Sequence, residues 1–198
     1  MTKIHFQKSK LNPIIPRKYN TFHSIHVANP DILEIGDKYF LYFRGQGIEG
    51  NDQIGVATCN KDEFDGVKWE FYKNNPIIRV EPEKNMFDNQ HILDPATIIN
   101  NNKIYLYYAG HSKNKECSIG LAISKDGYNF EKNSLPVIKN AMSPEIVYNN
   151  NQYHLFYSKL SKNGNLDIYK SISDNGINFH SEVKVFSPSN KKNEFDSF

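Results

Sequence analysis

Three carboxylates stand beside prolines that recur along the chain. They are Asp31 after Pro30, Asp94 before Pro95 and Glu145 after Pro144. A carboxylic acid can protonate a leaving oxygen, and a carboxylate can activate water or attack as a nucleophile. Hydrolysis of a glycosidic bond uses two such groups on either side of the bond, and a third can tune their pKa values. The three acids therefore indicate this chemistry if the fold brings them together.

Polar side chains near the same prolines form a candidate substrate-binding set. Asn29 and Ser143 directly precede Pro30 and Pro144, and His26 and His91 each lie four residues before their proline. The two histidines suit sugar hydroxyls or the neighbourhood of a metal, and a hydrogen-bonded structural role is equally open. Arg44 can fork onto a carboxylate or a pair of hydroxyls, or remain a solvated surface group. We interpret His111 and His154 as surface or packing residues.

The elements that carry these residues recur as a repeat. Each proline begins a strand, and an aromatic second strand places Leu41, Leu106 and Leu155 eleven residues after the three prolines. A third strand, an Asp-Gly or Asn-Gly turn and an aromatic residue follow, with short fourth strands expected at 75–78, 135–138 and 182–185. The sequence therefore predicts an all-β fold of three four-stranded β-propeller blades, at 29–80, 92–139 and 142–187.

The first strand of each blade is expected to line the central tunnel of the propeller. Because side chains two apart in a strand share a face, the residues before and after each proline should point to the same side. Each blade then brings at least one carboxylate to the axis. A structural role stays open for all three acids, because an aspartate beside proline often accepts backbone hydrogen bonds in a turn.

Both ends of the repeat frame carry unmatched pieces. Residues 12–15 repeat the fourth-strand sequence 75–78 but precede the first blade, so we expect them to be the closing strand of a missing last blade. Phe195 and Asp196 echo Phe87 and Asp88, so the chain stops where another blade should begin. Closure removes exposed sheet edges, and closed propellers have at least four blades. We therefore expect a fragment of a roughly five-bladed protein, or a homodimer whose two chains complete one ring.

Composition narrows the class of partner. The formal net charge is only +2, with 24 basic and 22 acidic residues spread along the chain, which provides no nucleic-acid or membrane-surface footprint.

The N-terminus lacks an apolar leader, so a cytoplasmic protein is expected. Cys59 and Cys117 form no disulfide framework, which fits free thiols in a reducing compartment. No metal-spaced cluster or phosphate loop occurs, so we predict no cofactor, although a cation in the tunnel stays open.

On these motifs the chain resembles the five-bladed β-propeller glycosidase superfamily, which includes glycoside hydrolase families 43, 32, 68, 117 and 130. The matching segments lie within residues 12–180 and are strongest at 93–97, 103–110 and 119–127. The resemblance implies that Asp94 orients or tunes the catalytic acid and that Glu145 is the nearest candidate for that acid. The first-blade base of these enzymes is an aspartate before proline. Asn29 stands there and cannot act as a carboxylate base, so Asp31 is the expected replacement.

The opening of the chain also resembles family 130, at residues 12–15, 27–30 and 42–44. Those enzymes act on mannosides, some by phosphorolysis, with an asparagine in a similar first-blade place. The leading hypothesis is a glycosidase-like propeller that acts on an oligo- or polysaccharide. The alternative is a carbohydrate-binding or structural propeller fragment without activity. The sequence leaves open the sugar, the linkage, and a retaining or inverting outcome.

Overall fold

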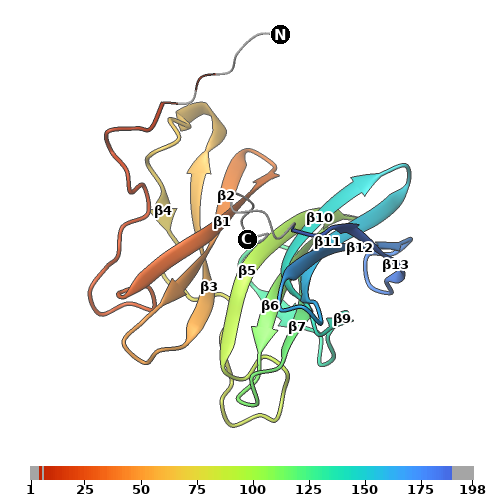
Figure 1. Ribbon diagram of the computed structural model, residues 1–198. Helices are drawn as coiled ribbons and strands as arrows, with labels where there is room; N and C mark the ends of the chain where they lie inside the picture. Colours follow the sequence, from red (N-terminus) through yellow and green to blue (C-terminus); the bar gives the residue numbers. More distant parts are fainter. Residues whose placement is uncertain (1–4, 6, 189–198) are drawn as a thin grey trace.

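The computed structural model describes residues 5 and 7–188 as three antiparallel sheets, one for each blade (Figure 1). Blade 1 contains β1 (His26–Ile35), β2 (Lys38–Gln46), β3 (Asp52–Asn60) and β4 (Glu70–Phe71), with a short 3-10 turn, η1 (Lys61–Glu63), between β3 and β4. Blade 2 contains β5 (His91–Asn100), β6 (Lys103–His111), β7 (Cys117–Ser124), β8 (Phe130–Lys132) and β9 (Ile138–Lys139). Blade 3 contains β10 (Met142–Asn149), β11 (Gln152–Leu160), β12 (Leu166–Ser173) and β13 (His180–Phe186).

This architecture confirms the predicted fold class, an all-β partial propeller. The inner strand β5 lies between β1 and β10, so the three inner strands are neighbours (Figure 1). No helix in the described part of the chain is long and apolar enough to cross a membrane.

Tight turns connect the inner strand of each blade to its second strand. Residues in the left-handed region occupy all three turns: Gly36, Asn101, Asn102, Asn150 and Asn151, with φ between 49° and 61°. Two-residue hairpin loops favour this conformation because its twist matches that of the flanking strands. Asparagine and glycine adopt it at low cost, so the local sequence determines where each hairpin turns.

The fourth strand differs from the prediction in blades 1 and 2, whereas the predicted 182–185 lies within β13 of blade 3. In blades 1 and 2 the aromatic segment after the turn begins the outer strand, as β4 and β8, while 75–78 and 135–138 form a second and separate contact with the third strand. In blade 1 that contact is one bridge between Ile54 and Ile78. The side-chain amide of Asn75 extends it, accepting from the Val56 N–H at 2.9 Å and donating to the Val56 carbonyl at 2.8 Å. A side chain therefore supplies the hydrogen bonds that a strand residue would have made.

The role of residues 12–15 as the closing strand of a missing last blade stays a prediction. This segment pairs with no strand among the described residues, and a strand needs a neighbouring backbone to satisfy its N–H and C=O groups. Ile15 is instead buried against Leu41, Phe43 and Ala57, so the segment contributes apolar side chains to the core of blade 1. The echo at Phe195 and Asp196 lies outside the described residues.

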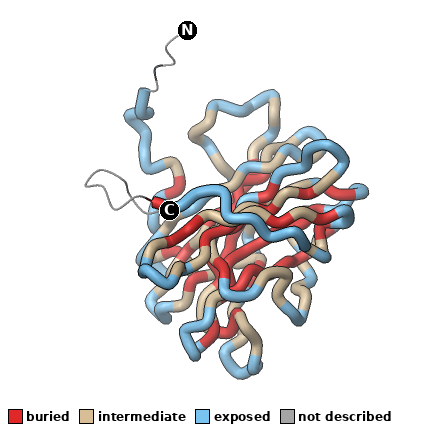
Figure 2. Tube along the Cα trace, turned by 45° about the vertical axis from the view of Figure 1, so that its right-hand side comes forward, coloured by how far each residue is buried: buried red, intermediate tan, exposed pale blue. Residues whose placement is uncertain are grey.

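The blades pack face to face through their second and third strands. Buried residues dominate β2, β3, β6 and β7, whereas β13 is exposed along its whole length. Figure 2 shows the buried chain in the interior of the molecule. Two buried tyrosines span the interfaces: the Tyr42 hydroxyl donates to the Gly127 carbonyl at 3.2 Å, and the Tyr107 hydroxyl donates to the Gly176 carbonyl at 2.6 Å. A Cβ at Gly127 would lie 2.7 Å from the Phe40 ring, so the turn of blade 2 needs glycine to dock. In blade 3 the equivalent position is Phe156, which has no hydroxyl to donate.

We predict that Tyr107→Phe lowers the free energy of unfolding by about 1–2 kcal/mol, because the buried Gly176 carbonyl loses its donor. Urea denaturation of the purified chain measures this. Tyr148→Phe is the matched control, because Tyr148 is half exposed and its hydroxyl has no hydrogen-bond partner among the described residues; a change of less than about 0.5 kcal/mol is expected there. Equal effects of the two substitutions would show that the bond between blades contributes nothing.

Candidate active site

Each inner strand is bulged at its proline. The register shifts between Ala28 and Asp31 in β1, between Leu93 and Ala96 in β5, and between Met142 and Glu145 in β10. The residue before each proline is left-handed, with φ of 48° at Asn29, 52° at Asp94 and 51° at Ser143. A non-glycine residue held there costs of order 1–3 kcal/mol, and such positions cluster at functional sites. Because the left-handed residue recurs in all three blades, it is a regular structural feature of the inner strand.

The bulge changes the expected alternation of side chains. An extra residue interrupts the pleat, so the residues before and after each proline do not follow the simple two-residue rule. In blade 1 the two side chains contact different partners on β5: Asn29 contacts Asp94, whereas Asp31 contacts Thr97. The shared face that the sequence predicted is therefore replaced by two adjacent sets of contacts.

Asp94 lies where the three inner strands meet. Its Oδ1 accepts a hydrogen bond from the Asn29 amide of blade 1 at 2.6 Å, and its Oδ2 accepts one from the Ser143 hydroxyl of blade 3 at 3.3 Å. Burial raises the pKa of Asp94 above the usual aspartate range, against the charges of Arg44 and His111 and the two hydrogen bonds, which lower it. One half-buried carboxyl group thus joins all three blades and holds its proton more tightly than a solvated aspartate.

Asp31 and Glu145 form a second pair of acids beside this junction. The Asp31 carboxylate accepts hydrogen bonds from the Thr97 N–H at 2.7 Å and from the Thr97 hydroxyl, which ties blade 1 to blade 2. Burial still raises the pKa of Asp31. Glu145 is exposed, and partial desolvation followed by the negative charge of Asp31 raises its pKa. All three predicted acids therefore favour the protonated form relative to free carboxyl groups.

A buried carboxylate that the sequence analysis missed organises the predicted binding residues. Asp52, only 2% exposed, accepts from Arg44 Nε at 2.7 Å and from Gln46 Nε2 at 3.1 Å. His91 Nδ1 lies 2.9 Å from the second oxygen of the same carboxylate. Asp52 aligns in the repeat with Cys117 and Leu166, so no recurrence marks it as polar. The network fixes Arg44 by its Nε, and its two terminal guanidinium nitrogens make no hydrogen bond to a described residue.

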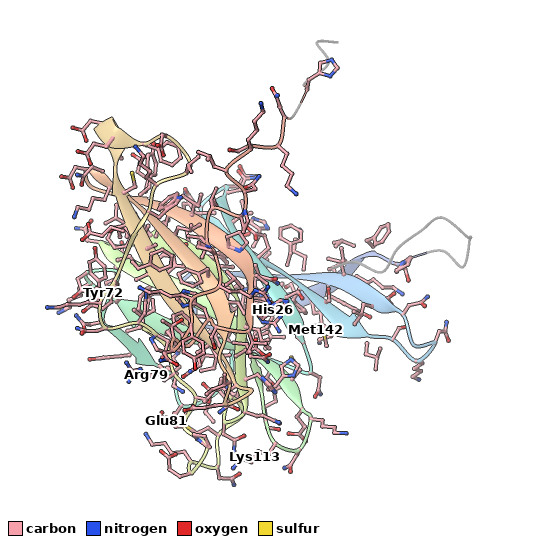
Figure 3. All side chains as sticks on the ribbon, turned by 90° about the vertical axis from the view of Figure 1, so that its left-hand side faces the viewer. His26, Tyr72, Arg79, Glu81, Lys113 and Met142 are labelled. Atoms are coloured by element: carbon pink, nitrogen blue, oxygen red, sulfur yellow. The ribbon has the colours of Figure 1, made fainter. Side chains whose placement is uncertain are left out.

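The remaining candidate residues lie around this network. The His111 ring, interpreted from sequence as surface or packing, is half-buried with its centroid 6.1 Å from that of His91. Burial, and then the neighbouring His91, lowers the pKa of His111. His26 is exposed at the start of β1, where Figure 3 labels it, and its side chain has no hydrogen-bond partner among the described residues. Hydrogen bonds and neighbouring charges thus link every predicted site residue except His26, whose side chain makes no such contact with a described residue.

The cysteines and metal-binding groups add little to this site. Cys59 and Cys117 are both free thiols, and burial followed by the charge of Asp94 raises the pKa of Cys117 to about 12. A thiol with so high a pKa is protonated at neutral pH and is a poor nucleophile. Residues 5 and 7–188 contain no cluster of three or more His, Cys, Asp or Glu side chains arranged to hold a metal ion.

Comparison with known proteins relates this chain to glycoside hydrolases. The profile of the glycosyl hydrolases family 32 N-terminal domain matches residues 32–144, more than half of the chain. Among solved structures, a family 117 glycoside hydrolase of the marine bacterium Zobellia galactanivorans aligns with a TM-score of 0.70 and 24% identity, over 84% of this chain and 48% of that one. A β-1,2-mannobiose phosphorylase from Listeria innocua aligns with a TM-score of 0.71 and 15% identity, over 90% and 65%.

A thermostable family-43 glycoside hydrolase aligns with a TM-score of 0.66 and 21% identity, over 86% of this chain and 56% of that one. At these identities the likeness shows the shared propeller fold. The chain therefore spans about half to two thirds of the length of these three enzymes. A comparison with curated proteins finds no match.

We predict that Asp52→Asn lowers the free energy of unfolding by about 2 kcal/mol, because Arg44 loses a buried ionised partner at constant side-chain shape. Chemical denaturation at neutral pH measures the change. Asp62→Asn is the control, because Asp62 is exposed and has no hydrogen bond or ion pair among the described residues. A difference below about 0.5 kcal/mol between the two variants would mean that Asp52 does not hold the network together.

The raised pKa of Asp94 predicts the direction in which the stability of the chain changes with pH. The folded chain binds this proton more tightly than the unfolded chain does, so ionisation of Asp94 costs stability as the pH rises from about 4 towards 7. Asp94→Asn removes this cost. We therefore expect the stability of the wild type minus that of Asp94→Asn to fall as the pH rises, measured by urea denaturation across this range.

Asp126 provides a control of opposite sign. Although burial raises its pKa, hydrogen bonds from Asn129, Tyr128 and Ser124 outweigh burial and hold it at about 2. The stability of the wild type minus that of Asp126→Asn should therefore rise as the pH climbs through about 2 to 4. If both differences moved in the same direction with pH, burial of Asp94 would not control its ionisation.

Proposed function

The chain belongs to the glycosyl hydrolases family 32 N-terminal domain family, and we propose that its three-blade junction supplies the acids that cleave a glycosidic bond in an oligo- or polysaccharide. The observation that carries the proposal is the carboxyl group of Asp94, which is half-buried, has a raised pKa and is bonded to the blades on both sides. A second acid of raised pKa, Glu145, lies on the neighbouring inner strand.

We assign Glu145 as the proton donor. It is exposed enough to reach a bound ligand, and its raised pKa favours the acid form that protonates a leaving oxygen. Asp31 is the candidate base or nucleophile. Its negative charge raises the pKa of Glu145, and Thr97 donates hydrogen bonds to only one of its carboxylate oxygens, Oδ2. Asp94 orients the site through its hydrogen bonds with Asn29 and Ser143. Its own charge also influences the charge that develops beside them.

The polar residues around these acids suit the binding of sugar hydroxyls. Arg44 and His91 are held by Asp52, so they present fixed donors at little cost in side-chain entropy. Asn29, Ser143 and the exposed His26 provide further donors and acceptors at the ends of the inner strands. Since the chain spans only part of its solved relatives, we propose that further blades, or a second copy of this chain, complete the site in the active assembly.

A second candidate function is carbohydrate binding without turnover. Two observations favour it. Asn29 occupies the place of a carboxylate base and uses its amide to hold Asp94, and the substitute base Asp31 already accepts two hydrogen bonds from Thr97. A base with occupied lone pairs is weaker, which would leave a site that recognises a sugar but does not cleave it.

Activity of single variants on a panel of oligosaccharides separates the two functions. We expect Glu145→Gln to lower kcat by about 10²–10⁴, the usual effect of removing a general acid. Asp94→Asn should lower kcat as well, because the site loses the carboxyl group that orients it. Glu131→Gln is the control, because Glu131 is an exposed carboxylate of β8 with no hydrogen bond or ion pair among the described residues. Turnover that persists unchanged in both site variants contradicts the assignment, and saccharide binding without turnover in the wild type favours the binding function.

A further inference from the structure

Blade 1 contains a pocket that none of the three acids lines. It has a volume of about 670 Å³ and is bounded by residues 18–24, by residues 47–53 of the β2–β3 loop and the start of β3, and by the outer segment 71–75. Figure 3 labels Tyr72, one of the lining residues. The volume lies within the range of roughly 300–1,000 Å³ that is usual for small-molecule sites. A pocket of this size separate from the acids needs its own explanation.

The pocket wall combines aromatic rings with free amide groups. Phe22, Phe71 and Tyr72 contribute half-buried rings, and Asn51 and Gln53 contribute half-buried amides. Neither amide makes a side-chain hydrogen bond to another described residue, so each offers two donors and an acceptor. A sugar ring has apolar C–H faces that pack on aromatic rings and hydroxyl groups that both donate and accept hydrogen bonds. The wall matches both properties.

The charges around the pocket favour a neutral ligand. Lys18 and Lys73 oppose Glu49, and all three side chains are exposed and outside any ion pair among the described residues. Exposed charges are screened by water and salt, so they contribute little to selectivity. Deeper in the wall, burial and then the charge of Lys18 lower the pKa of His23, which keeps its imidazole neutral. The groups that a ligand meets in the wall are thus uncharged.

In blade 2, polar contacts close the region that is equivalent to this pocket. There Asp88 accepts hydrogen bonds from Tyr108 at 2.8 Å and from Lys132 at 2.9 Å. The repeat-equivalent residues of blade 1 are His23, Phe43 and Phe71 in place of Asp88, Tyr108 and Lys132. They interact only through their rings, with His23 stacked on Phe71 at 5.5 Å and 6° between planes. Stacked aromatic rings in blade 1 thus occupy the positions that form an ion pair in blade 2.

The loops show the same difference. In blade 2, Lys113 donates its ammonium to the Pro82 carbonyl at 2.7 Å and its backbone N–H to Asn89 at 3.0 Å, which draws the incoming segment onto the β6–β7 loop. The equivalent of Lys113 in blade 1 is Ile48, which is 81% exposed and has no side-chain donor. Thr21 and Phe22 lie against Gly47 at the start of the β2–β3 loop, but Ile48 makes no polar contact equivalent to that of Lys113, and the pocket lies beside it.

We infer that this pocket binds a neutral saccharide and is a second carbohydrate site, distinct from the acid cluster. The choice of a saccharide rests in part on the proposed function, whereas the choice of a neutral one rests on the wall itself. Such a site would hold a sugar unit of a polymer on blade 1 while another unit occupies the acids.

The test is a titration of the ¹⁵N-labelled full chain, as Asp94→Asn to prevent turnover, with neutral gluco-, manno-, galacto- and fructo-oligosaccharides. We expect the backbone amide signals of residues 18–24, 47–53 and 71–75 to shift on binding. Gln53→Ala should raise the dissociation constant by about five- to tenfold, the equivalent of one or two lost hydrogen bonds. Asn114→Ala, which removes an exposed amide from the corresponding loop of blade 2, should leave it unchanged.

The inference is overturned if no neutral oligosaccharide shifts these signals, if Gln53→Ala binds as tightly as the parent, or if a matched uronic-acid oligosaccharide binds more tightly than its neutral counterpart. Shifts confined to residues 91–97 would also overturn it and would leave the proposed function intact. Shifts at the pocket from a wild-type chain that cleaves none of these sugars would support the second site while counting against the proposed function.

Discussion

The hydrogen bonds to Asp94 join three strands that are far apart in the sequence. Asn29 on β1 donates to one carboxylate oxygen and Ser143 on β10 donates to the other, so β5 is fixed between its neighbours. These contacts require the left-handed conformation before each proline, which costs free energy that the hydrogen bonds offset. The arrangement of the candidate acids depends on this junction, because Asp31 and Glu145 each follow a bulge that the junction holds in place.

The two candidate sites lie where the repeat is imperfect. Residues that keep the blades together recur almost unchanged, as in the tyrosines whose hydroxyl groups meet the turn carbonyls of the next blade. Positions that differ between blades form the two candidate sites. One example is the change from Asn29 to Asp94 to Ser143 at the bulge. Another is the replacement of an Asp88–Lys132 ion pair by stacked His23 and Phe71. A common scaffold thus positions side chains that are free to diverge.

The sequence predicted the fold well, because a repeat constrains many residues at once. The three blades, their hairpins and the meeting of the inner strands follow from recurring prolines, leucines and Asn or Gly turns. The sequence-based prediction failed where the orientation of side chains depends on a local detail of the backbone. The bulges interrupt the alternation assumed for Asn29 and Asp31. Asp52 escaped notice because its place in the network depends on contacts with another blade, which no local pattern encodes.

The central claim is that Asp94 is a desolvated carboxyl group shared by three blades. A titration of the aspartate carboxyl carbons by ¹³C NMR tests it most directly, with Asp94 assigned from the Asp94→Asn spectrum and repeated in Arg44→Gln. The account predicts that Asp94 titrates above the usual aspartate range of about 3.9, and higher still without Arg44, whose charge lowers its pKa. A pKa in the ordinary range, unchanged by the loss of Arg44, would mean that Asp94 is solvated and that the three-blade junction does not exist in solution.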